Sequence, residues 1–376
     1  MHLVFVTPRY GQAIVGGAES AVRSFATRIA ARGHEVEVIT STSITLDWED
    51  QLPVGTSLED GVIVHRLRPR RPRDPQFGLL YRQSLATGYL PDSTAASQFL
   101  LDQGPILDEL WPLLDRLNPD RVISYPLLYW PNVQAIRWNP ARSVLHPAAH
   151  PEAILASLAY IDVVPSARRI VLQTHAEQQL VNRLFPLAPT RQLVLGLGRE
   201  ERRYPIASQQ LPHRSYLLAL GRVQADKGAR LLASIYRDAR PSLDLILAGP
   251  IVEPIDAPPG ITLAGIVGDQ EREALIAYAR AVVIASRYES FSLVATEAMN
   301  SGVPIIVNGF NPVLVEQVEN SGAGVAFRSA AELLGAIELL ANDPVLSHSL
   351  GSNGLRYVAA NLSWDSIIDR YLDFLR

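Results

Sequence analysis

The chain has 376 residues, and at roughly 150 residues per domain this length predicts about two domains. Hydrophobic residues make up 48% of it and charged residues 19%, which is an ordinary globular composition. The net charge of −4 argues against a nucleic-acid binder, and the lack of cysteine excludes disulfides and cysteine-ligated metals. The apolar start at residues 3–6 is too short for a signal peptide, and prolines and glycines interrupt the uncharged stretch 298–315. We therefore expect a cytoplasmic protein, with the inner face of the membrane as an alternative location.

In the first half of the chain, short apolar runs alternate with segments of helical periodicity. The run at residues 2–7 predicts a buried parallel strand, and a glycine-rich loop and an amphipathic helix over residues 18–31 follow it. Later runs predict strands at residues 36–40, 62–67, 121–124, 143–145 and 169–172. Because the chain starts as a β-α-β unit, we expect a doubly wound sheet in an α/β domain. Residues 69–119 have no clear periodicity.

A second alternating series begins at Ser215 and predicts another domain of the same kind. Its strands are expected at residues 216–220, 243–248, 261–263, 282–285, 304–307 and 325–327. Helices are expected near residues 227–238, 272–279, 291–300, 312–319 and 330–341. We therefore predict an N-terminal domain over residues 1–198, a linker over 199–214 and a C-terminal domain over 215–361. Residues 362–376 predict an amphipathic terminal helix, which either stays on the second domain or crosses back to the first.

The 34 basic residues include 33 arginines and a single lysine, Lys227. Lys227 and Gly228 open a predicted helix, and Gly221 and Arg222 end the strand before it. Cations on the two sides of one loop can converge on a diphosphate, where arginine binds two oxygens and lysine adds a compact charge. A cation opposes the helix dipole in the first turn, so helix formation alone does not explain Lys227. We favour anion binding over the alternatives, a salt bridge to Asp226 or a solvated helix start.

Glu289 and Glu297 are eight residues apart and flank the predicted start of a helix that follows a buried strand. The backbone N–H groups of Phe291, Ser292 and Leu293 would face the crevice at the strand end, where they suit a phosphate. The two carboxylates would accept hydrogen bonds from sugar hydroxyls. Glutamate pairs at this spacing are common, but their place at a strand end predicts a site for a sugar and a phosphate.

Gly16 and Gly17 lie between the first strand and the first helix, where an α/β sheet exposes backbone N–H groups to an anion. Two adjacent glycines let the backbone approach a ligand, and an ordinary tight turn is the alternative. Neither this loop nor residues 196–201 has the G-x-G-x-x-G spacing, which weakens the case for a nicotinamide dehydrogenase.

Two further groups of residues are less specific. His146 and His150 follow a predicted strand, but only Glu152 is near as a third ligand, so we predict no metal site. Residues 47–50 lack the D-x-D spacing of a metal-bridged nucleotide-sugar site. Residues 66–73 carry five arginines, which form either a solvated loop or a surface for an acidic acceptor or an anionic membrane. The second interpretation assigns that surface to Arg68, Arg70, Arg71 and Arg73.

Together these motifs resemble those of the retaining nucleotide-sugar glycosyltransferases of the GT-B fold, family 4, over nearly the whole chain. The most specific part is residues 289–304, which is similar to an E-x7-E motif running into E-A-M-x-x-G-x-P. Gly221 to Gly228 looks like the family's G-R…K-G pair, and the Gly16 loop and the Ser363 helix also fit. The Asn-Gly-Val-Asp stretch that the family often has is missing at residues 195–199.

The resemblance implies two Rossmann-like domains facing across a cleft, with the donor mainly on the second domain and the acceptor on the first. Arg222 and Lys227 would hold the donor diphosphate, Glu297 the ribose hydroxyls and Glu289 the hexose hydroxyls. His150 would lie beside the donor sugar, near the reacting centre. The Gly16 loop and the N–H groups of residues 291–293 would complete the donor site.

The implied reaction is the transfer of a hexose from a nucleoside-diphosphate sugar to a hydroxyl acceptor, with retention and without a metal or a separate cofactor. A UDP-sugar is the favoured donor and GDP-mannose the alternative. The acceptor would be a cell-surface glycan, a glycolipid or a secondary metabolite, with peripheral membrane contact as an option and no nucleic-acid partner. Two other functions stay open: a sugar-nucleotide epimerase of GT-B-like fold, and a catalytically silent nucleotide-sugar-binding module.

Overall fold

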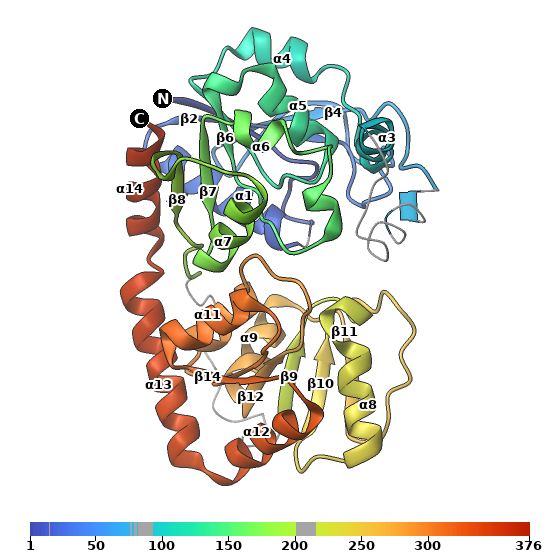
Figure 1. The fold of residues 1–376 in the computed structure, drawn as a ribbon, viewed down its shortest axis with the longest axis vertical. Helices are drawn as coiled ribbons and strands as arrows, with labels where there is room; N and C mark the ends of the chain where they lie inside the picture. The colour runs from blue at the N-terminus through green and yellow to red at the C-terminus, as the bar shows by residue number, and fades with distance from the viewer. Residues whose placement is uncertain (15, 76, 79–80, 82–92, 201–215) are drawn as a thin grey trace. The chain divides into compact units, whose positions relative to one another are not determined.

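The computed structural model describes residues 1–376 except for residues 15, 76, 79–80, 82–92 and 201–215. The chain divides into two compact units: unit 1 comprises Met1–Leu195 together with Ile368–Arg376, and unit 2 comprises Gly196–Ile367. Each unit is a β-sheet of mainly parallel strands with helices packed against it (Figure 1). The predicted fold class, two Rossmann-like α/β domains, is confirmed. Most of the predicted linker 199–214 lies outside the described residues.

Unit 1 is built on an eight-stranded sheet in the order β3-β4-β2-β1-β5-β6-β7-β8, in which only β3 runs antiparallel to its neighbour. The strands are β1 His2–Val6, β2 Glu35–Ser41, β3 Gly55–Glu59, β4 Val62–Leu67, β5 Arg121–Ser124, β6 Ser143–Leu145, β7 Arg169–Leu172 and β8 Gln192–Val194. The chain winds outward from β1 in both directions, to β2 on one side and to β5 on the other. In such sheets ligands bind outside the carboxyl ends of the two strands at this switch point.

The helices of unit 1 are α1 Gly17–Ala31, α3 Ser93–Gln103, α4 Leu110–Leu117, α5 Trp130–Trp138, α6 Val163–Ser166 and α7 His175–Leu184. Helix α1 buries Val22, Phe25 and Ile29 at the spacing from which a helix was predicted there. No helix among the described residues is both long and apolar enough to cross a membrane.

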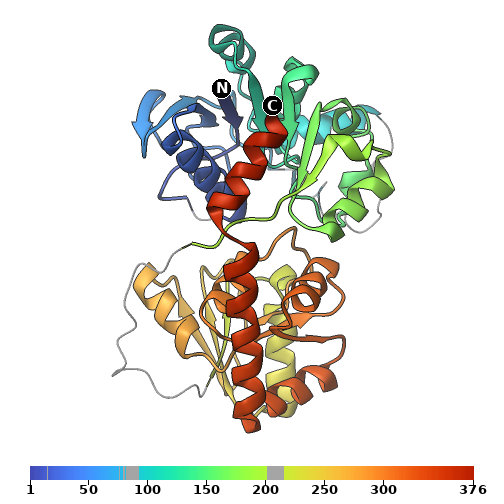
Figure 2. The same cartoon turned by 90° about the vertical axis from the view of Figure 1, so that its left-hand side faces the viewer.

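The terminal helix α14 (Trp364–Leu375) contributes its second half to unit 1, as Figure 2 shows. The buried Tyr371 hydroxyl lies 2.9 Å from Nε2 of His146, and Arg121 Nε donates to the Leu375 carbonyl at 2.9 Å. The rings of Phe25 and Tyr125 pack against His146, with centroids 5.6 and 5.1 Å away. Burial lowers the pKa of His146 to about 3, so this histidine is a neutral core residue that anchors α14.

Unit 2 has a six-stranded parallel sheet in the order β11-β10-β9-β12-β13-β14. The strands are β9 Tyr216–Leu220, β10 Asp244–Ala248, β11 Ile261–Gly265, β12 Ala281–Ile284, β13 Ile305–Asn308 and β14 Gly324–Phe327. The helices are α8 Ala229–Ala239, α9 Asp269–Tyr278, α10 Leu293–Asn300, α11 Pro312–Ser321, α12 Ala330–Asn342 and α13 Pro344–Asn361. The winding direction changes between β9 and β12, so the expected ligand site of this unit lies outside their carboxyl ends.

The 18-residue helix α13 was not predicted from the sequence. Its glycines argue against a helix locally, but they let it pack directly on the turn after α10. A Cβ on Gly351 would lie 2.1 Å from the carbonyl oxygen of Gly302, and one on Gly354 would lie 3.1 Å from Cα of Met299. Tertiary packing therefore outweighs the low helix propensity of glycine here.

Candidate functional site

The carboxyl ends of β9 and β10 in unit 2 come close together because glycine follows each strand. Gly221 and Gly249 have φ values of 126° and 142°, and a Cβ on Gly249 would lie 2.0 Å from the carbonyl oxygen of Gly221. Only glycine tolerates both the conformation and the contact. The next residue, Arg222, is exposed and forms no ion pair or hydrogen bond with any described residue. Its guanidinium is available to a ligand at this edge.

Lys227 forms an ion pair with Glu289, in which Nζ donates to Oε1 at 2.7 Å. The two side chains are 28% and 16% exposed, so the pair is largely withdrawn from water. Lys227 follows β9 in the chain and Glu289 follows β12, so the pair joins the two strand ends of the switch point. The single lysine of the chain and the first glutamate of the E-x7-E motif thus belong to one charged site.

Lys227 does not open a helix, contrary to the prediction from the sequence. It ends a 3₁₀ turn, Ala225–Lys227, and α8 starts after Gly228, which has φ 84°. A Cβ on Gly228 would lie 2.4 Å from Cβ of Ala285 and 2.6 Å from the Ala285 carbonyl oxygen. Asp226 accepts a backbone hydrogen bond from Arg287 at 2.8 Å and is not the ion-pair partner of Lys227. The turn is therefore fixed against the end of β12, which sets the position of the Lys227 backbone.

Helix α10 starts beside this pair and presents free backbone donors. Ser292 is its N-cap, and the Ser292 hydroxyl accepts from the Ala295 N–H at 3.3 Å. Among the described residues, nothing accepts a hydrogen bond from the N–H groups of Phe291, Ser292 or Leu293. These donors and the positive end of the helix dipole suit an anionic group.

Glu297, the second glutamate of the motif, lies one turn further along α10. It pairs with Arg272 of α9, and its side chain is 29% exposed. Burial raises the pKa of Glu297, and the attraction of the Arg272 guanidinium opposes that shift. The carboxylate is half-buried and can accept hydrogen bonds from hydroxyl groups. Arg272 was missed in the sequence, because 25 residues separate it from Glu297 and no motif connects them.

In unit 1, the loop before α1 is organised by an ion pair between Arg9 and Glu19. A Cβ on Gly16 would lie 2.1 Å from Oε2 of Glu19, so Gly16 leaves the space in which this carboxylate folds back over the helix start. Gly17 is the first residue of α1, and a Cβ added to it would meet nothing within 4 Å. The loop therefore already holds an anion of its own, the Glu19 carboxylate, near the N-terminus of α1.

His150 lies in the loop that follows β6 and is held by a carboxylate. Its Nδ1 is 2.9 Å from Oε1 of Glu152, and the Tyr81 hydroxyl donates to Oε2 of the same carboxylate at 2.7 Å. A carboxylate at Nδ1 selects the tautomer with the proton on Nδ1 and the lone pair on Nε2. Glu152 therefore orients the His150 ring.

The backbone of the His150 loop is held by a second buried carboxylate, Glu177 of α7. Its two oxygens accept from the N–H groups of Ala149 and Gln173, both at 2.6 Å. Burial raises the pKa of Glu177 to about 7, against the opposing effect of these hydrogen bonds. The sequence contained a signal that was not used: Thr174 and Glu177 have the spacing of a capping box after a strand.

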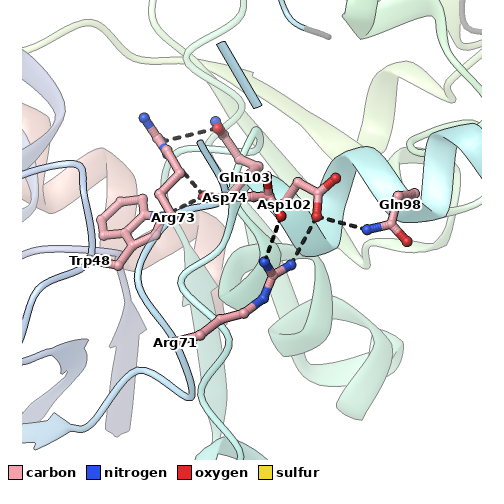
Figure 3. A network of polar contacts seen from close by, with 7 residues as sticks. All are labelled: Trp48, Arg71, Arg73, Asp74, Gln98, Asp102 and Gln103. Atoms are coloured by element: carbon pink, nitrogen blue, oxygen red, sulfur yellow. Dashed lines mark hydrogen bonds and ion pairs between the residues drawn. The ribbon is translucent and has the colours of Figure 1, made fainter. Parts of the chain in front are cut away.

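The arginine run of unit 1 has internal partners, several of which Figure 3 shows. Arg68 pairs with Asp50, and Arg70 pairs with Asp108, although their side chains are 69% and 58% exposed. Arg71 bridges Asp74 and Asp102 at 2.9 Å each. Arg73 lies against the Trp48 ring and Gln103. The run is therefore part of the folded unit, and Arg68 and Arg70 retain the most exposure.

Within the described ranges, one group of side chains has ligand atoms close enough for a metal ion: His2, Glu35 and Glu37. These residues lie at the amino ends of β1 and β2, at the edge opposite the expected ligand site, and Glu37 is bonded to His2 and His65. His146 and His150 do not form a pair, because His146 contacts Tyr371 in the core and His150 contacts Glu152.

Comparisons with known proteins agree with this architecture. Residues 205–357 match the family model of the group 1 glycosyl transferases. The D-inositol 3-phosphate glycosyltransferase 1 of Catenulispora acidiphila is 27% identical over 395 residues, which cover 96% of this chain and 90% of that protein.

Two solved structures share the fold at low sequence identity. The sucrose-phosphate synthase of Thermosynechococcus elongatus superposes with a TM-score of 0.74 at 16% identity, over 99% of this chain and 97% of that one. Anabaena Alr3699/HepE in complex with UDP-glucose gives a TM-score of 0.70 at 15% identity, over 100% and 99%. The resemblance found in the motifs is therefore confirmed for the fold, and the match over residues 205–357 agrees with a group 1 glycosyl transferase.

Proposed function

We propose that this chain is a family 4-like glycosyltransferase of the GT-B fold, and that it transfers a hexose from a nucleoside-diphosphate sugar to an acceptor hydroxyl. The transfer retains the anomeric configuration and needs no metal. The observation that carries this proposal is the Lys227–Glu289 ion pair between the ends of β9 and β12. It places the only lysine of the chain where an α/β sheet binds its ligand.

In this proposal, Arg222 and Lys227 hold the donor diphosphate. Arg222 has no partner among the described residues, and Lys227 has one carboxylate partner, so both can take phosphate oxygens. An ammonium with three donors can keep Glu289 and bind a phosphate as well. The backbone N–H groups of residues 291–293 add donors at the helix start.

The carboxylates of unit 2 recognise the two sugars of the donor. Glu289 accepts hydrogen bonds from the hexose hydroxyls, because it lies beside the cations that hold the diphosphate. Glu297 accepts from the ribose hydroxyls, and its ion pair with Arg272 keeps the carboxylate in place and opposes the rise in its pKa that burial causes. For unit 1 we propose donor-binding roles for the Gly16 loop, where a donor would have to replace the Glu19 carboxylate, and for His150, which Glu152 orients.

The chemistry follows from these residues. The bond between the anomeric carbon and the diphosphate oxygen breaks, and the cations stabilise the charge that develops on the leaving diphosphate. The acceptor hydroxyl attacks from the same face and gives its proton to the departing phosphate oxygen. No residue of the proposed site is assigned as a covalent nucleophile, in contrast to a retaining glycosidase.

The proposal for the donor base comes from similar proteins, and that for the acceptor comes from the arginine run of unit 1. The similar Anabaena protein was solved with UDP-glucose, which favours a UDP-sugar. The MMP alpha-(1->4)-mannosyltransferase of Mycolicibacterium hassiacum, 31% identical over 43% of this chain, is named for mannosyl transfer, and we keep GDP-mannose as the alternative donor. For the acceptor or a membrane surface we retain the arginine run, Arg68, Arg70, Arg71 and Arg73, with the exposed Arg68 and Arg70 as its outer part.

The experiment measures nucleotide release from UDP-glucose and GDP-mannose in excess EDTA, without acceptor and with neutral sugars, phosphorylated sugars and glycolipids. We expect release that depends on an acceptor and persists in EDTA. Epimerised donor without acceptor would indicate an epimerase, and binding without turnover would indicate a silent module. An absolute requirement for Mg²⁺ or Mn²⁺ would overturn the role given to Arg222 and Lys227.

A further inference from the structure

One arginine differs in its charge pairing from the rest of the run at residues 66–73. The other four arginines each pair with a carboxylate among the described residues: Arg66 with Glu59, Arg68 with Asp50, Arg70 with Asp108, and Arg71 with Asp74 and Asp102. Arg73 forms no ion pair with a carboxylate in the same part of the chain. It is therefore the member of the run with no described carboxylate at ion-pair distance, and the carboxylate that acts on its charge is that of Asp47, which raises its pKa against the effect of burial.

Arg73 is nevertheless held firmly by neutral groups. Its guanidinium carbon lies 4.9 Å from the centroid of the Trp48 ring and 4.7 Å from that of Phe77. The guanidinium donates to the carbonyl and to the side-chain oxygen of Gln103, at 3.3 and 3.0 Å, and the Arg73 N–H donates to the Asp47 carbonyl at 2.7 Å. Figure 3 shows Arg73 beside Trp48, with its guanidinium next to the Gln103 side chain. The cation is thus rigid, and because burial lowers its pKa, it is also partly desolvated.

Arg73 lies at the edge of unit 1 where a ligand is expected. The Trp48 ring packs edge-on against the ring of Tyr129, 5.7 Å away, and Tyr129 is the N-cap of α5, which follows β5. Arg9, which follows β1, is near enough that its like charge lowers the pKa of Arg73. The carboxyl ends of β1 and β5 form the switch point of this sheet.

Arg9 and residues 43–45 carry buried polar atoms that lack hydrogen-bond partners within the described ranges. Arg9 Nη1 donates to the Ile44 carbonyl at 2.8 Å, but its Nε is buried without an acceptor. The hydroxyls of Ser43 and Thr45, on either side of Ile44, are likewise buried and unpaired. Buried polar groups are normally hydrogen-bonded, so these unpaired atoms, in a segment that Arg73 joins through the Asp47 carbonyl, point to a polar ligand.

We propose that Arg73 binds an anionic group of the acceptor, a phosphate or a carboxylate, and so selects acidic acceptors over neutral ones. The inference rests on the proposed function, in which unit 1 carries the acceptor. A guanidinium binds either group through two parallel N–H···O bonds, and its rigid attachment to Trp48 and Gln103 fixes the direction of that fork. Such a contact orients the acceptor. The hydroxyls of Ser43 and Thr45 would then bind the uncharged polar groups of the acceptor.

The test uses binding, so that it does not depend on turnover. Glucose 6-phosphate, glucuronate and glucose are titrated at constant ionic strength, and the emission of Trp48 is isolated by comparison with a Trp48→Phe variant. Arg73→Gln is compared with Arg137→Gln, which removes an exposed arginine from α5. Thermal unfolding verifies each fold, and Arg73→Lys is the second variant, since it keeps the charge and removes the fork.

We expect a saturable change with glucose 6-phosphate or glucuronate and none with glucose. Arg73→Gln should weaken this binding at least tenfold and Arg73→Lys severalfold, whereas Arg137→Gln should leave it unchanged. The ligand with the larger response identifies phosphate or carboxylate as the recognised group. Equal responses to glucose and its phosphate, or unaltered binding in Arg73→Lys and Arg73→Gln, would overturn the proposal and leave Arg73 a packing residue. Loss of hexosyl transfer with this binding intact would instead count against the proposed function.

Discussion

Replacing Lys227 by arginine tests the phosphate site with little change in net charge. The pair that Lys227 forms with Glu289 has an Nζ–Oε1 distance of 2.7 Å, and the side chains are only 28% and 16% exposed. The backbone cannot shift to accommodate a longer side chain, because the turn is fixed by Gly228 against Ala285. A guanidinium therefore places its charge at a different point.

The expected loss of kcat can be estimated from enzymes in which one hydrogen-bond donor to the transition state was removed. Removing one well-placed donor costs about 2.7–4 kcal/mol, so Lys227→Met should lower kcat by roughly 10²–10³. Lys227→Arg retains the charge but misplaces it, and we expect a fall of about tenfold or more. Both variants are assayed by release of UDP from UDP-glucose, with thermal unfolding as a check on the fold. Arg230→Lys is the matched control, because Arg230 is 66% exposed in its pair with Glu253. A fully active Lys227→Arg enzyme beside an intact fold would refute the reasoning.

Three other predictions concern the carboxylates, a glycine and the anchor of α14. Glu297→Ala should weaken UDP binding in calorimetry, whereas Glu289→Ala should mostly lower turnover; equal losses of UDP affinity would contradict this division. Gly228 has a φ of 84°, and a Cβ there would lie 2.4 Å from Cβ of Ala285, whereas Gly33 has a φ of 81° and nothing within 4 Å of the added Cβ. Gly228→Ala should therefore lower the free energy of unfolding at least twice as much as Gly33→Ala. The left-handed conformation alone costs about 1–2 kcal/mol, and similar losses in both variants would argue against the contact. Folding lowers the pKa of His146 from about 6.5 to about 3. As the pH falls below 6.5, the unfolded chain takes up a proton that the folded chain does not, so the free energy of unfolding, which is full above pH 6.5, decreases. Between pH 6.5 and 5 the loss should be about 1.6 kcal/mol in urea titrations, and it should disappear in His146→Gln but persist in His348→Gln, whose histidine is exposed.

Much of the fold was predictable because parallel strands are continuous apolar runs. The strands predicted at 121–124, 143–145, 169–172 and 216–220 have the same bounds in the structure. The edge strands β3 and β8 were missed, since their residues are largely polar or only partly buried. Helix α13 was missed because its glycines act through contacts with a distant turn, which local patterns do not contain.

The candidate site was only partly predictable. Lys227 and Glu289 were both predicted as site residues from their motifs. The ion pair between them depends on the order of strands in the sheet, in which β9 lies next to β12. Spacing gave no hint of Arg272, which meets Glu297 only through the packing of α9 on α10. Glu152 was noted as a metal ligand candidate, whereas the structure shows it holding His150 and Tyr81. Pairings between distant segments are set by tertiary structure, and a single sequence does not specify them.

The central claim, retaining transfer of a hexose from a nucleoside-diphosphate sugar, is tested most directly by proton NMR of the product. The enzyme is incubated in EDTA with UDP-glucose, an α-linked donor, and the acceptor that gives the fastest UDP release. Retaining transfer predicts one UDP released for each hexose transferred and an α-linkage in the new glycoside, which Lys227→Met should form far more slowly. A β-linked product, or epimerised UDP-sugar without a glycoside, would contradict it.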